Sequence, residues 1–464
     1  IQYFKEQERI YPKRAWGRYR KIKWVVMIIT LGIYYLAPWI RWDRGPNAPD
    51  QAILVDIPHS RGYFFFIEIW PQEVYYLTGI LILAAVGLFF VTSLFGRVWC
   101  GYTCPQTVWT DLFIWVERIV QGDRNARMKL DNSPLSLEKI WKKGLTHFIW
   151  LVIGMLTGGA WVFYFNDAPT LAEDILNGQI PNAVLGWVVA LTFSTYVMAG
   201  FAREQVCTYM CPYARFQSAM FDKDSLIIAY DEPRGEPRGK FKDKETHPNQ
   251  GDCIDCSLCV QVCPMGIDIR KGLQLECIAC GLCVDACNEV MEKLDLPKGL
   301  IRYDTTHNKE ARAHGDVAER FHILRARTLW YTAIMAIVGG LMLFSLINRA
   351  PLELHVLHDR NPLYVTLSDG SIRNGYDIKI LNKTHDDKTY SLRFEGMENA
   401  EMKVQGITGV SADNLPVYSD SVANYRIFVV APKPAVERTE VRFILHDNAT
   451  GNEDTMDTIF MSGK

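Results

Sequence analysis

Five long apolar runs divide the chain, and they alternate with polar segments that carry most of the charged residues. Each run holds 17 to 22 mostly apolar residues, which is about the length that a helix needs to cross a ~30 Å hydrocarbon layer. The pattern therefore predicts an α-helical bundle of five membrane spans. They cover residues 24–40, 74–95, 145–165, 183–202 and 329–347.

After residue 347 the apolar positions recur with a period of two, which is typical of half-buried β-strands. Clear examples are Tyr376/Ile378/Ile380, Tyr390/Leu392/Phe394 and Tyr425/Ile427/Val429. About seven short strands of this kind predict an all-β, immunoglobulin-like sandwich. We expect it to lack the disulfide of immunoglobulins, because residues 348–464 contain no cysteine.

The basic residues predict how the chain is oriented in the membrane. Residues 1–23 and 96–144 each carry eight Lys and Arg, whereas residues 41–73 carry three and residues 166–182 carry none. By the positive-inside rule, the N-terminus and residues 203–328 lie in the cytoplasm and the residues after 347 lie outside. The formal net charge of −2 argues against a nucleic-acid-binding protein.

All twelve cysteines lie between residues 100 and 287, on the expected cytoplasmic side. Eight of them form two runs of C-x-x-C-x-x-C-x-x-x-C, the bacterial pattern for two [4Fe–4S] clusters, in which the fourth cysteine of each run ligates the other cluster. Zinc is the alternative, but two identical four-cysteine runs favour iron–sulfur clusters. The segment is thus predicted to be an inserted α+β ferredoxin-like domain that relays single electrons. Its two ligand sets are Cys253, Cys256, Cys259 and Cys287, and Cys277, Cys280, Cys283 and Cys263.

The other four cysteines form two C-x-x-x-C-P motifs, Cys100/Cys104 and Cys207/Cys211, each of which follows an apolar run. A Phe–small–Arg step precedes both motifs, so they look like an internal duplication. If a motif is helical, its cysteines share one face; if the proline is the first helical residue, the second cysteine lies at a helix N-terminus. Four thiols brought together would suit Cu(I), zinc or an iron–sulfur centre. Inert buried cysteines are the alternative.

These parts, in this order, resemble the FixG/CcoG/RdxA family over essentially the whole chain. The family comprises membrane polyferredoxins that are accessory proteins of cbb-type cytochrome c oxidases. The resemblance implies an oxidoreductase, a cupric reductase that converts Cu(II) to Cu(I) for copper delivery in oxidase assembly. It assigns the copper role to Cys100, Cys104, Cys207 and Cys211. It also implies a multi-pass protein of the bacterial inner membrane, with the ferredoxin domain in the cytoplasm and the C-terminal domain in the periplasm.

The expected division of the chain has five parts. They are the N-terminal tail with four spans and both motifs (1–221), a polar linker (222–252), the ferredoxin domain with a connector (253–328), the fifth span (329–347) and the external sandwich (348–464). No Walker or G-x-G-x-x-G pattern is present, so we expect no nucleotide-binding domain and a separate cytoplasmic electron donor.

Two other functions are left open. One is a NapH/NosR-like subunit that passes electrons from quinol or a cytosolic donor to a partner reductase. The other is a copper chaperone or assembly scaffold whose clusters are structural. Expected partners are the lipid bilayer and a copper exporter or oxidase-assembly factors, and a homodimer is one alternative for the oligomeric state.

Overall fold

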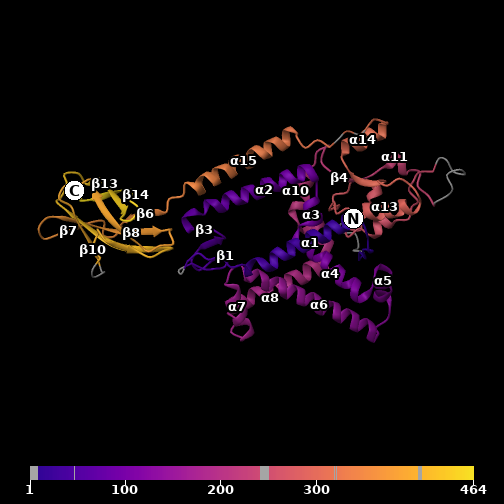
Figure 1. Cartoon of the computed structure of the whole chain (residues 1–464), viewed down its shortest axis with the longest axis horizontal. Coiled ribbons are helices and arrows are strands. Elements are labelled where there is room, and N and C mark those ends of the chain that lie inside the picture. Colours follow the sequence, from indigo (N-terminus) through magenta and orange to yellow (C-terminus); the bar gives the residue numbers. More distant parts are fainter. Residues whose placement is uncertain are drawn as a thin grey trace, which may run out of the picture. The chain divides into compact units, whose positions relative to one another are not determined.

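In the computed structural model (Figure 1), the described residues are 9–45, 48–240, 250–317, 319, 321–405 and 410–463. The chain forms two compact units. The first, the membrane–ferredoxin unit, comprises Ile1–Ile40 and Gln51–Met342. The second, the β-sandwich unit, comprises Arg41–Asp50 and Leu343–Lys464.

The prediction of five spans is confirmed, because five helical segments of the described chain are long and apolar enough to cross a membrane. These segments are Arg18–Trp39, Pro71–Phe95, Leu137–Val162, Asn182–Met210 and Ala326–Ile347. The third begins before the predicted residue 145, since the Ser136 side chain accepts a hydrogen bond from the Lys139 amide and caps the helix there. The fourth runs on past residue 202 through two π-helical turns.

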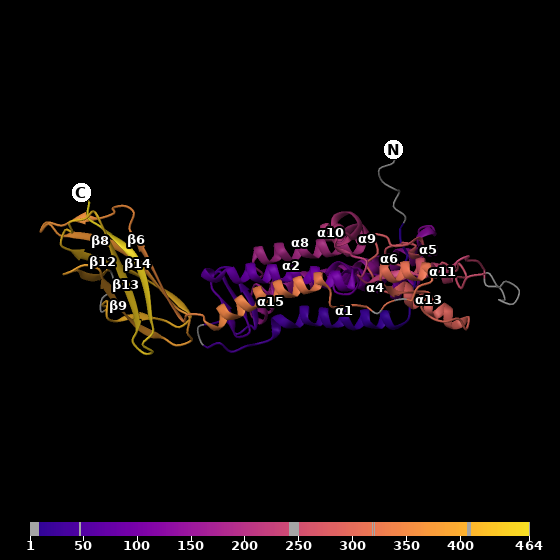
Figure 2. The same cartoon turned by 90° about the horizontal axis from the view of Figure 1, so that it is seen from above.

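The long helices α1, α2 and α8 run lengthwise through the membrane–ferredoxin unit (Figure 2). Helix α6 packs closely on α8, because an added Cβ at Gly158 would lie 2.9 Å from the Val188 carbonyl oxygen and one at Gly154 would lie 3.2 Å from that of Thr192. Two small residues four apart let the two backbones meet, as in other membrane helix pairs. The long helices are α1 (Arg18–Leu36), α2 (Tyr75–Phe95), α6 (Leu137–Val162), α8 (Asn182–Val197) and α15 (Ala326–Ile347).

The segments between the spans contain structure that the apolar runs did not predict. Helix α4 buries Phe113 and Val116 against Trp150 of α6, and β1, β2 and β3 form a three-stranded antiparallel sheet. These elements are α3 (Val98–Tyr102), α4 (Pro105–Gln121), α5 (Arg124–Asn132), α7 (Ala168–Leu176), β1 (Ile53–Asp56), β2 (Arg61–Phe64) and β3 (Ile67–Ile69).

The ferredoxin segment has the expected α+β composition, and its two strands β4 and β5 pair antiparallel. Strand β4 lies inside residues 222–252, which we expected to be a linker. Its residues, Ile227–Tyr230, are all buried, so this part belongs to the packed fold; residues 241–249 lie outside the described chain. The elements between α8 and α15 are α9 (Arg203–Gln205), α10 (Pro212–Met220), β4 (Ile227–Tyr230), α11 (Glu232–Gly235), α12 (Leu258–Gln261), α13 (Leu282–Lys293), β5 (Ile301–Asp304) and α14 (Thr306–His314).

The β-sandwich unit confirms the predicted immunoglobulin-like architecture, with more strands than the alternation indicated. One sheet has the order β10-β12-β8-β6, with β7 paired to β8, and the other has the order β11-β9-β13-β14. Alternate residues such as Ile378, Ile427 and Phe443 face inward and are fully buried. The strands are β6 (Leu352–His358), β7 (Val365–Thr366), β8 (Ile372–Asn382), β9 (Lys388–Glu395), β10 (Glu401–Gln405), β11 (Leu415–Val417), β12 (Ser421–Ala431), β13 (Arg438–Asp447) and β14 (Glu453–Met461).

Candidate redox site

The two cysteine runs of the ferredoxin segment adopt matching backbone conformations. Asp255 and Ala279, which precede the second cysteine of each run, have φ angles of 52° and 51°. Ser257 and Gly281, which follow that cysteine, have φ angles of 54° and 74°. Left-handed conformations are uncommon for residues other than glycine, so their recurrence at corresponding positions shows that the two loops turn in the same way.

The fold places the fourth cysteine of each run beside the first three of the other run. The Cys287 thiol lies within electrostatic range of Cys253, Cys256 and Cys259, and the Cys263 thiol lies within range of Cys277 and Cys280. Cys283 lies within range of Cys263, Cys277 and Cys280. We call Cys253, Cys256, Cys259 and Cys287 the first group, and Cys263, Cys277, Cys280 and Cys283 the second group.

The surroundings of these thiols fit metal-bound sulfurs. Burial raises the pKa of Cys263 and of Cys287 to about 12, so the free thiols would be neutral at physiological pH. A bound iron ion would deprotonate them and compensate their charge. The two groups therefore fit two [4Fe–4S] clusters. Of the eight cysteines only Cys256 is exposed, which leaves the first group nearer to solvent.

Each C-x-x-x-C-P motif makes a tight turn between two helices. Cys104 precedes α4, whose first residue is Pro105, and its amide donates to the carbonyl of Trp99 at 2.9 Å. Cys211 precedes α10, whose first residue is Pro212, and its amide donates to the carbonyl of Val206 at 2.7 Å. Of the two geometries that the motif allows, the structure has the one in which proline begins a helix.

The first cysteines of the motifs lie in the turns that lead to these helix starts. Cys100 is in α3, and Cys207 is in the second π-helical turn, Val206–Met210. The Cys100 thiol lies within electrostatic range of Cys104, Cys207 and Cys211, and burial raises its pKa to about 12. Its Sγ also lies 3.3 Å from Oε1 of Gln217, which is fully buried. The two motifs thus place the Cys100 thiol within electrostatic range of the other three thiols, and we call these four cysteines the four-thiol site.

The loop of the second ferredoxin group packs directly on the four-thiol site. Cys100 contacts the apolar cluster that includes Ile278 and Cys280, and the Tyr102 hydroxyl donates to the carbonyl of Cys280 at 3.1 Å. A Cβ at Gly101 would lie 2.7 Å from the carbonyl oxygen of Ile278. From the other motif, Cys207 lines a small cavity together with Ile278. The first motif therefore contacts the loop that carries Cys277 and Cys280, and the second motif lines a cavity together with that loop.

The two arginines that precede the motifs have different partners. The Arg97 guanidinium is buried and donates to the carbonyl oxygens of Leu275 and Ala214. It therefore ties the first motif both to the ferredoxin loop and to α10. The Arg203 guanidinium points into the helical bundle, where it donates to Glu117 at 2.7 Å and lies over the ring of Trp150.

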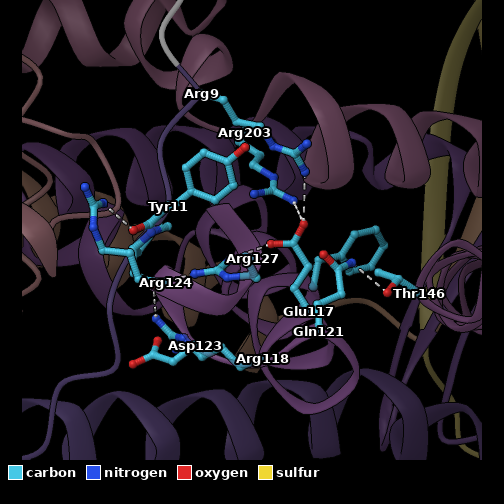
Figure 3. A network of polar contacts seen from close by, with 12 residues as sticks. Arg9, Tyr11, Glu117, Arg118, Gln121, Asp123, Arg124, Arg127, Thr146 and Arg203 are labelled. Carbon is cyan, nitrogen blue, oxygen red and sulfur yellow. Dashed lines mark hydrogen bonds and ion pairs between the residues drawn. The ribbon is translucent and has the colours of Figure 1, made fainter. Parts of the chain in front are cut away.

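Glu117 is the centre of a buried ion network on α4 (Figure 3). Its carboxylate accepts hydrogen bonds from Arg203 at 2.7 Å and from Arg127 at 2.8 Å, and Arg9 lies at 3.4 Å. Although burial disfavours its charged form, Arg203 and Arg127 hold the pKa of Glu117 below its ordinary value. In this network, only Arg203 belongs to a motif that the sequence analysis identified, the Phe–small–Arg step.

Three family models match the chain. One is described as a 4Fe-4S binding domain (residues 77–122), one as a 4Fe-4S dicluster domain (residues 202–306) and one as an IG-like fold at the C-terminal of FixG (residues 342–463). The chain is thus an iron–sulfur protein, and with its five spans it is a multi-pass membrane redox protein.

Curated relatives match nearly the whole chain. The nitrogen fixation protein FixG of Rhizobium meliloti is 49% identical over 471 residues, covering 95% of this chain and 90% of FixG. Protein RdxB of Cereibacter sphaeroides is 49% identical over 464 residues, covering 98% of this chain and 97% of RdxB. Protein RdxA of the same organism is 45% identical over 454 residues, covering 96% and 94%. The chain therefore belongs to the FixG/RdxA family.

Proposed function

We propose that this membrane iron–sulfur protein reduces Cu(II) to Cu(I) at the four-thiol site and so supplies copper for assembly of a cbb-type cytochrome c oxidase. The observation that supports this most directly is the contact of the first C-x-x-x-C-P motif with the loop that carries Cys277 and Cys280. Soft sulfur ligands favour Cu(I) over Cu(II). Binding at Cys100, Cys104, Cys207 and Cys211 would therefore help to drive the reduction of the bound ion.

The arrangement of the ferredoxin cysteines suggests a direction for the electrons. When bound, the two [4Fe–4S] clusters supply electrons one at a time, and Cu(II) needs one electron to become Cu(I). Cys253, Cys256, Cys259 and Cys287 would hold the cluster nearer to solvent, where a separate cytoplasmic donor docks. Cys263, Cys277, Cys280 and Cys283 would hold the cluster beside the four-thiol site. Tyr102 and Tyr303 fix this inner loop through the carbonyls of Cys280 and Ala279, at 3.1 and 2.6 Å.

The test is an anaerobic Cu(II) challenge of the purified, chemically reduced protein, read with a Cu(I)-specific chelator. We expect Cys104→Ser/Cys211→Ser to lose Cu(I) production while its cluster absorbance stays normal. The matched control is Thr103→Ser/Met210→Ser, which changes the residue next to each of these cysteines. Equal Cu(I) production by the cysteine variant and the control would refute copper reduction at this site.

One observation favours a second candidate for the four-thiol site, an additional iron–sulfur centre. The 4Fe-4S binding model matches residues 77–122, and the only cysteines in that range are Cys100 and Cys104. Two cubane clusters correspond to about eight iron atoms per chain, whereas a third would raise the content to about twelve. Iron and sulfide analysis of the wild type and of the cysteine variant would separate the two candidates.

The same preparations distinguish the remaining alternatives. Cluster reduction by quinol would favour a NapH/NosR-like subunit, and copper binding that is independent of cluster reduction would favour a chaperone or scaffold. In the proposed orientation the four-thiol site faces the cytoplasm of a bacterial inner membrane. Cu(I) would then pass to a copper exporter or an oxidase-assembly factor, while the β-sandwich unit lies in the periplasm.

A further inference from the structure

A cavity of about 410 Å³ lies between the start of α1 and helix α4. Its lining is strongly biased towards arginine and tryptophan, and none of the described residues that line it is acidic. Its lining includes residues on both sides of the start of the first span, which begins at Arg18. The lining residues used below are Arg14, Trp16, Arg20, Trp24, Trp115 and Arg118.

Three arginines in the lining give the cavity a positive charge. Nη2 of Arg118 donates to the carbonyls of Pro12 and Lys13 at 3.2 and 3.3 Å, but its buried Nε has no hydrogen-bond partner among the described residues. Burial lowers the pKa of Arg118 to about 10, so the side chain stays charged at neutral pH. Keeping a partly desolvated guanidinium charged is costly, and an anion bound beside it in the cavity would offset part of that cost.

Only part of the positive charge is neutralised from behind the cavity. Arg20 forms a buried ion pair with Asp111 at 2.8 Å, and Lys23 lies 3.8 Å from the same carboxylate. Arg14 is exposed, and its guanidinium lies over the ring of Trp16 at 4.0 Å. Asp123 accepts a hydrogen bond from the Arg14 amide at 3.1 Å and also lies within electrostatic range of Arg118. Two carboxylates, Asp111 and Asp123, therefore face the cations Arg14, Arg20, Lys23 and Arg118, so the positive charge is only partly neutralised.

The outer rim of the cavity is apolar. Trp16 and Trp115 are 58% and 40% exposed, and Trp24 packs edge-on against Trp115 with the ring centroids 6.0 Å apart. Tryptophan is enriched where a membrane protein meets the lipid headgroups. A small anion such as free phosphate would contact the arginines but leave this rim uncovered, whereas an amphiphile would contact both.

From this combination we propose that the cavity binds the headgroup of one anionic phospholipid. Its phosphate accepts hydrogen bonds from Arg118 and Arg14, and its acyl chains run along Trp16 and Trp115. Basic pockets beside membrane helices on the cytoplasmic side are known to bind anionic headgroups. The inference does not depend on which metal the four-thiol site holds.

The lipid site shares its chain segment with the contact between the membrane bundle and the ferredoxin domain. The amides of Tyr19 and Arg20 donate to the Asp285 carboxylate on α13, at 3.2 and 2.7 Å. The amide of Lys13 donates to the carbonyl of Gln261 at 2.8 Å. A lipid bound to Arg14 and Arg118 therefore helps to hold the segment that positions the ferredoxin domain.

The test measures lipid binding to the full chain after delipidation in detergent, by native mass spectrometry with phosphatidylglycerol or phosphatidylcholine added. We expect one phosphatidylglycerol per wild-type chain and at least tenfold weaker binding by Arg14→Gln/Arg118→Gln. Because Arg118 also holds the N-terminal segment, the exposed Arg14→Gln alone is the second variant, with an expected loss of threefold or more. Arg18→Gln is the matched control, since Arg18 is exposed on the same segment and does not line the cavity.

Two outcomes would overturn the proposal. The first is equal affinity of Arg14→Gln and Arg18→Gln for phosphatidylglycerol, which would show that the cavity is not the binding site. The second is displacement of the lipid by millimolar inorganic phosphate, which would show that the site recognises the phosphate group alone. Persistence of the lipid in phosphate, with selective loss in the Arg14 variants, is the supporting result.

Discussion

Replacing Gly101 by alanine should loosen the contact between the four-thiol site and the ferredoxin domain. The added Cβ would lie 2.7 Å from the carbonyl oxygen of Ile278 and 3.0 Å from Cα of Cys280. Both atoms belong to the backbone, so no side chain can rotate away. Ordinary contacts begin near 3.4 Å, and the two backbones must therefore move apart by about 0.7 Å.

The magnitude follows from two opposing effects. Overpacking of a close contact costs about 1–3 kcal/mol, whereas alanine is favoured over glycine in a helix such as α3 by roughly 0.5–1 kcal/mol. Because the contact effect is the larger, we expect a net destabilisation of roughly 1–2 kcal/mol. This corresponds to a factor of about 5–30 in the equilibrium between the docked and the loosened ferredoxin loop.

The assay is hydrogen–deuterium exchange of the purified, cluster-loaded protein, followed at peptides that cover residues 275–283. The matched control is Gly144→Ala on α6, where an added Cβ would meet no atom within 4 Å, so only the helix effect remains. We expect faster exchange in Gly101→Ala and unchanged exchange in Gly144→Ala. If the two variants exchange alike, the inference that α3 packs closely against the ferredoxin loop at Gly101 is refuted.

Three further substitutions test the contacts around the site and in the β-sandwich unit. Glu117→Gln should cost about 3–5 kcal/mol, because it leaves Arg127 and Arg203 buried without a counter-charge. Since the pKa of Glu117 is lowered, its contribution is complete above pH 4.5 and is lost as the pH falls below that value; thermal unfolding against pH checks both effects. Arg97→Gln removes donors to the carbonyls of Leu275 and Ala214 and should cost about 2–3 kcal/mol, seen as earlier loss of cluster absorbance on heating. In the β-sandwich unit, hydrogen bonds from Lys388 and Thr450 outweigh burial and lower the pKa of Asp447 to about 2, so Asp447→Asn should lower stability by about 2 kcal/mol above pH 3.8 and by progressively less below it, as denaturant unfolding would show.

The sequence predicted the parts of the fold whose signal is local. Each span is one uninterrupted apolar run, and the sandwich strands alternate with a period of two, so both architectures follow from the order of residues alone. The amphipathic helix α4 was missed because its apolar face is interrupted by Asp111 and Glu117, which are buried only because arginines from other elements neutralise them. Strand β4 was missed because its four residues follow a polar stretch, and only its pairing with β5 identifies it as a strand.

In the candidate site, too, the features with a local sequence signal could be predicted and the long-range contacts could not. The spacing of the cysteines predicts two ligand sets and a pair of matching motifs, and the proline after each second cysteine allowed the geometry that the structure has. The contact of Gly101 and Tyr102 with Cys280 could not be predicted, because it joins residues more than 170 positions apart. Nothing in the motif itself distinguishes a glycine that needs this close approach from one in an ordinary turn.

The two C-x-x-x-C-P motifs differ in the partner of the arginine that precedes each of them. In the first copy Arg97 reaches out to the ferredoxin loop, and in the second copy Arg203 reaches back to Glu117 in the bundle. If both arginines had the same partner, the four thiols would be anchored either to the ferredoxin loop or to the helical bundle, but not to both. With one arginine on each, the thiols are held against the bundle and against the loop of Cys277 and Cys280 at the same time. If the proposed function is right, a change in either arginine should therefore alter electron transfer to the four-thiol site even when all twelve cysteines are intact.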